Sequence, residues 1–315
     1  MNVLKPQPKG DRSTSTDPTK PNQIAPHHWQ EWLDSSINPE LIRANLLSLD
    51  GAAPYEYLCY ADSLPRTNSG RLTTTLLRRY THIEHGGWWC QGLDPLNDWT
   101  PMQWGCFKPD TPRNDNDRNK TIKYEHPLKI PTRAFFLQIP SQPDFWATKL
   151  ADPTQPILIV EGAKKAAALL SRGYAAIALP GVFNGRRVMR DEWGQRYSES
   201  LIPELAIFAA TGRPVYFCFD HDTKASTVHH VNLAIATTGK LLQDAGCEVN
   251  VIDLPGPEKG IDDFLVVQGD QAFQQAYAAA LPLSLWQWQW RKCAELTHPP
   301  TQIVHQPEFQ PTNLP

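Results

Sequence analysis

The sequence lacks several features that would place it in a class at once. No apolar run approaches the roughly 20 residues that a membrane-spanning helix needs, and the start, MNVLKPQPKGDRSTSTDPTKPNQ, has no apolar stretch typical of a signal peptide. The six cysteines are scattered, and no two form a C-x-x-C pair. Small disulfide scaffolds are excluded, because such chains are shorter and denser in cysteine. We therefore expect a protein of the reducing cytoplasm with no membrane partner.

The chain also lacks an excess of charge of either sign. Its formal net charge is -3, so any nucleic-acid binding has to come from local patches. It contains no G-x-x-x-x-G-K-[ST] segment, so this chain carries no P-loop helicase. Hydrophobic residues make up 41% of the 315 residues, which is enough to bury the cores of two domains.

Changes in composition and hydrophobic periodicity divide the chain into four predicted parts. Residues 1–26 are polar, proline-rich and without periodicity, which predicts a disordered arm. Residues 27–150 predict a smaller, strand-rich α+β domain, and residues 151–282 predict an α/β domain. Residues 283–315 predict a largely disordered extension, in which LWQWQW alternates like a strand or packs against the preceding sheet.

Residues 27–150 combine helical spacing with short strand-like segments. Apolar residues recur at helical spacing over 29–33, and Asn38-Pro39 opens a second predicted helix through Leu49. Gly, Pro and Asn then separate five segments that predict strands: TTTLLRRYTHI, GGWWCQGL, MQWGCFKP, TIKYEHP and RAFFLQI.

From residue 156 onward, apolar strands alternate with helices. PILIV, AAIALP, VYFCF and CEVNVIDL predict strands buried on both faces. AKKAAALLSRG and residues 225–245, 262–268 and 271–280 predict helices, and residues 184–210 predict a polar stretch with helical character. This alternation predicts a parallel sheet with right-handed crossovers.

Acidic residues follow three of these strands. Glu161 closes ILIVEG, Asp220 and Asp222 close VYFCFDHD, and Asp262-Asp263 lie in PEKGIDDFL. The carboxyl ends of parallel strands form the crevice where ligands bind, and carboxylates gathered there repel one another unless a cation neutralises them. Mg²⁺ takes such oxygens together with substrate phosphates. Taken singly, however, the glutamate is equally consistent with a strand-to-helix turn, and the aspartates are typical of helix N-caps.

The order of these acids resembles the Toprim domain of bacterial-type DNA primases, type IA and type II topoisomerases and some repair nucleases. ILIVEGAKKAAAL resembles the first Toprim motif, FDHD the Asp-x-Asp motif, and LPGV the glycine after the second strand. KGIDDFL resembles the Lys-Asp-Pro-Asp-Glu-Phe-Leu run that closes the Toprim domain of primases and primase-helicases, which favours the primase branch. The layout is similar to Toprim-containing replication proteins of plasmids, phages and other mobile elements, and the resemblance implies a Rossmann-like parallel sheet over residues 151–282.

Three features depart from that family pattern. Gly260 stands where the closing run of primases has its first acid. His221 and Thr223-Lys224 replace the small residues usual around Asp-x-Asp, and the segment 186–203 is longer than a minimal Toprim loop. These departures bear on polymerase activity more than on metal binding.

The resemblance implies roles for individual residues. Glu161 is then the catalytic residue, as a metal ligand or a general acid/base. The implied ligands of Mg²⁺ (or Mn²⁺) are Glu161, Asp220, Asp222 and Asp262. The candidate nucleotide or strand contacts here are Lys164, Asn184, Arg186 and Arg187. Lys165 is expected on a solvated helix face.

Basic and aromatic residues interleave between residues 60 and 133. This stretch has eleven Lys/Arg against eight Asp/Glu. Basic side chains follow phosphates, and aromatic faces stack on bases. The alternative is that its tryptophans form the core of a β-rich domain, which leaves nucleic-acid contacts open at Arg78, Arg79, Lys120 and Lys123.

Three functions follow from these patterns. The first is a primase-like DNA replication protein, with single-stranded DNA and nucleoside triphosphates as substrates and a separate replicative helicase as a candidate partner. The second is a non-catalytic module that binds nucleic acid or a helicase. The third is a Toprim nuclease. A topoisomerase is least favoured, because it needs a large strand-passage domain with a nucleophilic tyrosine.

Overall fold

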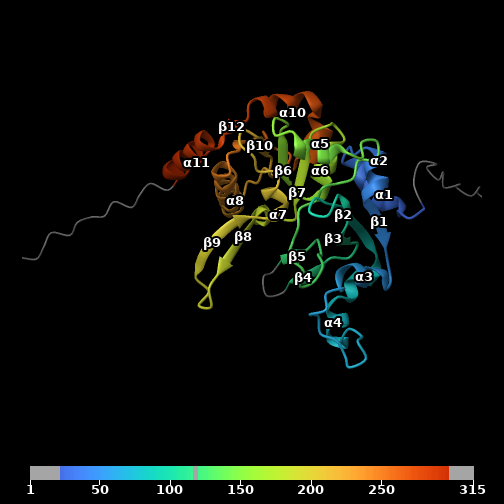
Figure 1. The fold of residues 1–315 in the computed structure, drawn as a ribbon. Coiled ribbons are helices and arrows are strands. Elements are labelled where there is room, and N and C mark those ends of the chain that lie inside the picture. The colour runs from blue at the N-terminus through green and yellow to red at the C-terminus, as the bar shows by residue number, and fades with distance from the viewer. Residues whose placement is uncertain (1–21, 116–119, 298–315) are drawn as a thin grey trace, which may run out of the picture.

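The computed structural model describes residues 22–115 and 120–297 (Figure 1). Most of the arm predicted over residues 1–26, and the chain after residue 297, lie outside the described residues. None of the described helices is both long and apolar enough to cross a bilayer. The described chain contains a parallel sheet with helices and, earlier in the sequence, a smaller antiparallel sheet.

Five strands form the larger sheet, in the order β12-β11-β10-β6-β7. Four of them run parallel: β6 (Ile157–Glu161), β7 (Ala176–Leu179), β10 (Pro214–Phe217) and β11 (Glu248–Val251). The short β12 (Leu281–Pro282) pairs antiparallel with β11. The predicted α/β class is therefore confirmed. The chain runs from β6 to β7 and then returns to the other side of β6 at β10, so the strand order reverses between β6 and β10.

Helices connect and cover the parallel strands. α6 (Ala163–Leu170) follows β6 and packs on β7, and α9 (Ile261–Val267) packs on α6, with α10 (Gly269–Ala278) beside it. α8 (Ala225–Asp244) connects β10 to β11 and packs on β11 together with α11 (Leu283–Thr297). Right-handed crossovers that run in opposite directions place α6 and α8 on opposite faces of the sheet. The strand alternative for LWQWQW is wrong, because this run lies in α11.

The N-terminal half contains an antiparallel sheet, ordered β1-β2-β3. Its strands are β1 (Leu46–Leu49), β2 (Gly87–Asp94) and β3 (Thr100–Pro109), and a separate hairpin pairs β4 (Arg113–Asp115) with β5 (Lys120–Ile122). The helices are α1 (Pro26–Asp34), α2 (Pro39–Asn45), α3 (Ala53–Leu58), α4 (Thr74–Arg79), the 3₁₀ turn η1 (Thr81–His85) and α5 (Phe145–Ala151). The strands predicted over GGWWCQGL and MQWGCFKP are present, whereas TTTLLRRYTHI is helical and the second helix ends at Asn45, where β1 follows.

A short extended segment, residues 134–137, joins the two sheets. The N–H of Leu93 in β2 donates to the carbonyl of Phe136 at 2.7 Å, and Phe135 exchanges two hydrogen bonds with Ala178 of β7. All four residues of the segment are buried, and one continuous hydrophobic core contains side chains from residue 24 to residue 286. The two sheets therefore share a core. The predicted domain boundary near residue 150 stays a prediction.

Arg133 reinforces this junction next to the segment. Its guanidinium donates to both carboxylate oxygens of Asp94 at 2.6 and 2.7 Å and to Glu204 Oε1 at 2.6 Å. The bonds to Asp94 raise the pKa of Arg133, and the guanidinium lowers the pKa of Asp94. Glu204 lies in α7 (Pro203–Ala206), so one side chain links β2 to the C-terminal half.

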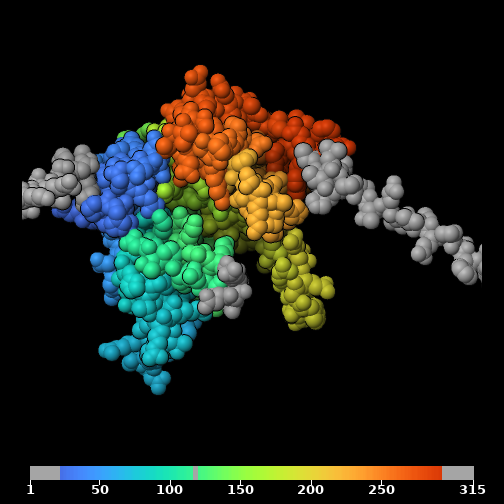
Figure 2. All heavy atoms as spheres, turned by 180° about the vertical axis from the view of Figure 1, so that it is seen from behind, coloured from blue at the N-terminus to red at the C-terminus, as the bar shows by residue number. Residues whose placement is uncertain are grey.

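A hairpin projects from the parallel sheet after β7 (Figures 1 and 2). It follows the 3₁₀ turn η2 (Val182–Gly185) and pairs β8 (Arg186–Arg190) with β9 (Arg196–Leu201), which pair with no other strand in the described chain. The helical character predicted over residues 184–210 is therefore wrong, apart from the single turn of α7. Both strands are largely solvent-exposed, so they carry no buried face that would give the sequence a strand period.

Candidate functional site

The predicted acids lie at the carboxyl edge of the parallel sheet, where the strand order reverses. Glu161 ends β6 and pairs with Leu179 of β7. Asp220 and Asp222 follow β10, and Asp262 lies in the first turn of α9. Three segments that are far apart in the sequence therefore bring acidic residues to one edge of the sheet. This edge is the usual position of ligands in open α/β folds.

The carboxyl group of Glu161 has a raised pKa. Its burial is the largest influence and raises its pKa above the ordinary value. The Lys165 ammonium opposes this shift, the negative charge of Asp220 adds to it, and the more distant Lys259 and Lys120 oppose it weakly. A carboxyl group that keeps its proton to higher pH is suited to proton transfer, so the environment of Glu161 fits the role of an acid or base.

Lys165 enters the acidic group from the first turn of α6. Its ammonium lies 2.6 Å from Asp220 Oδ1, and the two side chains are only 18% and 14% exposed. Burial acts to lower the pKa of Lys165, but the charges of Asp220, Asp262 and Glu161 raise it, so the amine stays charged. The expected solvated position of Lys165 is wrong. Helical side chains point back toward the helix N-terminus, which directs this one to the sheet edge.

Lys259 pairs with the second aspartate of the Asp-x-Asp segment. Its Nζ lies 3.0 Å from Asp222 Oδ2, but its side chain is 62% exposed. The hydrogen bond from Lys259 lowers the pKa of Asp222. The N–H of His221 also donates to the Lys259 carbonyl at 2.7 Å, which fixes the backbone of this loop. The two pairs differ, because the exposed Lys259 side chain is free to rotate into solvent and the buried Lys165 is not.

Asp262 is buried and incompletely satisfied. Its Oδ1 has no hydrogen-bond partner. Asp220 Oδ1 likewise makes no hydrogen bond of good geometry, although the Lys165 ammonium 2.6 Å away makes the contact an ion pair whatever its angle. An unpaired buried carboxylate oxygen is costly. A bound cation is the group that would offset this cost.

Because Gly260 has no side chain, the Lys165 side chain can lie against its backbone. A Cβ atom at position 260 would lie 2.5 Å from Lys165 Cε and 2.6 Å from Asp262 Oδ1, closer than real Cβ contacts. The backbone of Gly260 is extended, with a φ of -110°, so the conformation itself does not require glycine. The missing acid at position 260 and the buried lysine are therefore linked by packing.

By donor type, the four carboxylates fit Mg²⁺ or Mn²⁺, which prefer carboxylate oxygens. No three of the four have oxygens that all lie within 4.8 Å of one another. Asp220 and Asp222 are instead directed at their lysines. The residues present fit a divalent cation, and the Asp262 oxygen without a partner is the observation that supports this. The carboxylate side chains have to rotate before they can coordinate one ion together.

A second group of possible metal ligands lies elsewhere, on α1 and at the end of β3. His27, His28 and Asp110 form the one group of His, Cys, Asp and Glu ligand atoms within 4.8 Å that the described part of the chain contains. His28 Nε2 lies 2.8 Å from Asp110 Oδ1, and His28 Nδ1 lies 2.7 Å from Ser48 Oγ. Hydrogen bonds therefore hold this group together.

Lys164 is tied to the N-terminal half. Its Nζ lies 3.4 Å from Glu31 Oε1, which also pairs with Lys108 at 2.8 Å, while Trp88 Nε1 donates to Glu31 Oε2 at 3.0 Å. Burial acts to raise the pKa of Glu31, but these two lysines and the indole lower it. Lys164 is therefore a link between α1 and α6, and its ammonium is already paired within the chain.

Arg186 and Arg187 are also engaged within the chain. Arg186 forms an ion pair with Glu199 across the β8–β9 hairpin and lies over the ring of Phe183. Arg187 donates to the carbonyl of Thr132. Asn184 lies in η2, next to these arginines and partly exposed. The two arginines therefore hold the base of the hairpin.

The basic candidates of the N-terminal half separate into two places. Arg78 and Arg79 are exposed on α4, which lies at the end of the molecule farthest from the parallel sheet (Figures 1 and 2). Lys120 and Lys123 are exposed on or beside β5, and Lys120 is close enough to influence the pKa of Glu161. The structure therefore brings Lys120 toward the acids and leaves the two arginines remote.

Several residues near the site or on the surface escaped the sequence patterns. Tyr124 is 44% exposed, and its pKa is raised by its partial burial and by nearby groups that include Cys106, Glu31 and Asp262. On the hairpin, Trp193 is 77% exposed and Tyr197 is 62% exposed. Trp193 and Tyr197, which lie in an otherwise polar stretch of the sequence, are the signal that could have marked this hairpin as a binding surface. Large apolar groups are seldom left in solvent without a function.

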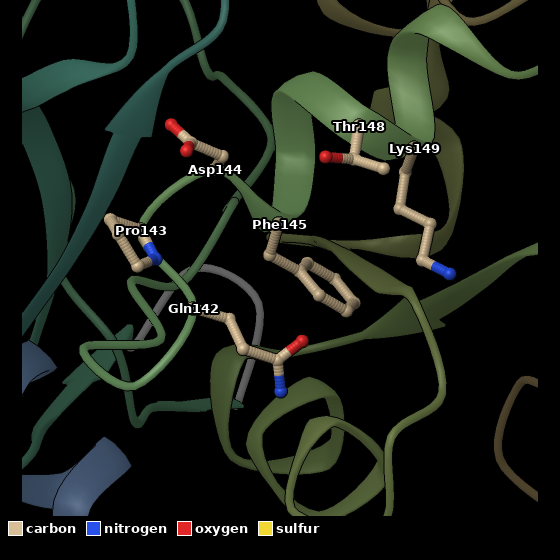
Figure 3. Close-up of a pocket in the computed structure, with 6 residues that line it drawn as sticks. All are labelled: Gln142, Pro143, Asp144, Phe145, Thr148 and Lys149. Carbon is tan, nitrogen blue, oxygen red and sulfur yellow. The ribbon is translucent and has the colours of Figure 1, made fainter.

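A surface pocket lies away from these acids. It has a volume of about 260 Å³ and opens at the start of α5, beside the Phe145 ring (Figure 3). Its lining residues are Gln142, Pro143, Asp144, Phe145, Thr148 and Lys149. None of the predicted site residues lines it, so the pocket does not mark the candidate site.

Part of the chain matches a described protein family. Residues 145–272 match the family described as a domain of unknown function, DUF3854. An uncharacterized protein of Picosynechococcus sp. is 43% identical over 298 residues, which cover 88% of this chain. The chain spans 30% of the length of that relative.

Solved structures of primase domains resemble the chain. The zinc-binding and RNA polymerase domains of the Aquifex aeolicus primase give a TM-score of 0.48 at 15% identity, covering 81% of this chain and 56% of that one. The DnaG primase catalytic domain bound to ssDNA gives 0.49 at 15% identity, covering 86% and 79%. Function therefore has to be inferred from the residues of the site.

Proposed function

We propose that this chain is a primase-like replication protein of the Toprim type, which binds single-stranded nucleic acid and transfers nucleotidyl groups at the carboxyl edge of its parallel sheet. The observation that carries the proposal is the meeting of Glu161, Asp220, Asp222 and Asp262 at the strand-order reversal. One buried oxygen of this group, on Asp262, has no partner. Such an edge binds ligands, and unpaired carboxylates there favour a cation and its phosphate.

The residues then have separate tasks in the transfer. A bound Mg²⁺ or Mn²⁺ would supply charge stabilisation at the phosphoryl oxygens, and Asp222 and Asp262 would hold it. Glu161, whose pKa is raised, accepts the proton of the 3′-hydroxyl as its oxygen bonds to the α-phosphorus and pyrophosphate leaves. The exposed Lys120 attracts the triphosphate toward the acids.

A second candidate function is a non-catalytic module that binds nucleic acid or a helicase. It is favoured by the two lysines, since Asp220 and Asp222 are already neutralised by Lys165 and Lys259. The two candidates differ in one outcome, which is the appearance of new phosphodiester bonds.

The deciding experiment incubates the full chain with single-stranded DNA, labelled nucleoside triphosphates and Mg²⁺, beside Glu161→Gln. We expect oligonucleotides from the wild type and a loss of at least about 100-fold in Glu161→Gln, because a general acid/base contributes about 10²–10⁴-fold. Binding of the DNA, followed by fluorescence anisotropy, should be unchanged. Glu248→Gln, at the exposed opposite end of β11, is the matched control and should retain full activity.

Each other outcome selects an alternative. Product from Glu161→Gln at the wild-type rate would show that the metal-site assignment is wrong. Degradation of the template would favour a nuclease. DNA binding with neither product nor degradation would favour the non-catalytic module.

The exposed hairpin is proposed as the strand-binding surface beside this site. Trp193 and Tyr197 offer stacking faces, and Arg190 and Arg196 flank them with exposed positive charge. We expect Trp193→Ala/Tyr197→Ala to weaken binding of a labelled single-stranded oligonucleotide by at least about tenfold, because one stacked base contributes about 1–3 kcal/mol. Anisotropy in EDTA measures this without any metal-dependent step.

Trp288→Ala is the matched control for the hairpin, because Trp288 is another largely exposed tryptophan, on α11. It should bind the oligonucleotide as the wild type does. Equal losses in both variants, or no loss in the hairpin variant, would show that the hairpin does not carry the strand.

A further inference from the structure

We propose that the acidic site holds one divalent cation and that the Lys165 ammonium is its second, built-in positive charge. This inference rests on the proposed function, because it concerns the same acids. It accounts for two features at once, a lysine inside the acidic group and a glycine in place of an acid at position 260.

The ammonium excludes a metal ion from one of the carboxylates. Lys165 Nζ lies 2.6 Å from Asp220 Oδ1. A Mg²⁺ ion on the same oxygen would lie at about 2.0–2.1 Å, so it would lie beside the ammonium and be repelled by its charge. Sites with two metals place the ions about 3.5–4 Å apart, and the Lys165 ammonium takes the place of one of these charges beside Asp220.

Packing keeps the Lys165 side chain in this place. It is mostly buried, and its Cε lies 2.5 Å from the position that a Cβ of residue 260 would have, so a side chain at 260 would require Lys165 to shift. Lys259 is different, because its side chain is exposed and reaches Asp222 from solvent. An arriving cation therefore displaces Lys259 and leaves Lys165.

The ligands that remain are enough for one ion. Asp262 offers an oxygen without a partner, and Asp222 becomes available when Lys259 rotates away. Two carboxylates with water and substrate phosphate fit the oxygen coordination that Mg²⁺ and Mn²⁺ prefer. The fixed charge of Lys165 then neutralises Asp220, whatever the metal concentration.

The test counts Mn²⁺ ions bound per chain, by titration with electron paramagnetic resonance detection of the free ion and without nucleotide. All chains carry Asp110→Asn, so that the His27–His28–Asp110 group contributes no ion. We expect one ion in this background and two after adding Lys165→Ala/Gly260→Asp, which removes the ammonium and restores an acid in the freed space. Lys165→Met alone should also admit a second ion. Lys240→Met, an exposed lysine on α8, is the control and should leave the count at one.

The outcomes separate this inference from the proposed function. Two ions in the chain with Lys165 intact would overturn the inference while leaving a metal site in place. One ion in both Lys165 variants would also overturn it, because the ammonium would then exclude nothing. No bound ion in any chain would overturn the proposed metal site and this inference together.

Discussion

Replacing Arg133 with alanine should lower the free energy of unfolding by about 3–5 kcal/mol, the usual result of removing one partner from a buried ion pair. Its guanidinium is the hydrogen-bond donor for Glu204 Oε1, and the Glu204 side chain is almost fully buried. The alanine variant leaves that carboxylate without its positive charge and also releases Asp94. Urea unfolding at pH 7 measures the loss.

Two comparisons make the result specific. Arg196→Ala removes a mostly exposed ion pair with Glu199 and should cost less than about 1 kcal/mol. Glu204→Gln in the Arg133→Ala background removes the uncompensated charge and should recover part of the stability. Equal losses from Arg133→Ala and Arg196→Ala would contradict the role of Arg133 at the junction of the two sheets.

The Arg133 effect should also depend on pH. The guanidinium holds the pKa of Asp94 below its ordinary value of 3.8. A carboxylate with a lowered folded-state pKa contributes its full stability above 3.8 and loses it as the pH falls through the lowered value. The difference between wild type and Arg133→Ala should therefore be constant near neutrality and shrink below about pH 4.

The second large effect is expected from Asp220→Asn. It should strongly reduce nucleotide transfer, because Lys165 loses the partner that holds its charge beside the acids, and it should also destabilise the chain by about 3 kcal/mol, because Lys165 keeps a buried charge without its closest partner. We take the lower end of the range because Glu161 and Asp262 still attract the ammonium. Thermal and urea unfolding measure the stability, and the oligonucleotide assay measures the transfer.

A suppressor separates the two effects of Asp220→Asn. Adding Lys165→Met removes the stranded charge, so the double variant should regain most of the stability and none of the activity. Such coupling is expected only between residues in contact. Additive losses in the double variant would show that Lys165 and Asp220 do not form the pair that the geometry indicates.

The parallel sheet could be predicted from the sequence because its central strands are buried on both faces. PILIV and AAIALP are continuous apolar runs for that reason. The position of the acids follows from the same fact, since the residue after each parallel strand has to lie at one edge. The Toprim resemblance, its primase branch and the boundaries of the parts remain predictions.

The remaining elements could not be predicted because their burial is irregular. The two strands of the β8–β9 hairpin contact only each other among the described strands, so neither has an apolar face. In α11 the alternation of LWQWQW imitates a strand, yet Trp286 and Trp290 are four residues apart and lie on one helix face, with ring centroids 5.9 Å apart. Trp288 between them faces solvent.

Lys165 escaped prediction for a different reason. A lysine in a helix usually extends into water, and its sequence context gives no sign of burial. Its position depends on Gly260, which lies in a loop far along the chain. Neither Lys165 nor Gly260 shows, when its sequence position is considered alone, that the two residues lie against each other in the fold.

The segment 134–137 has a consequence for how the chain can be divided. It covers the outer edge of β7 through the hydrogen bonds between Phe135 and Ala178. A shorter polypeptide starting at residue 145, where the DUF3854 match begins, would expose that edge. The edge strand, AIAL, is apolar and uncharged, and an uncovered edge of this kind recruits strands from other molecules. The polypeptide defined by the family match is therefore expected to aggregate when produced alone. In the full chain, residues 134–137 occupy the edge of β7 and so prevent self-association through it.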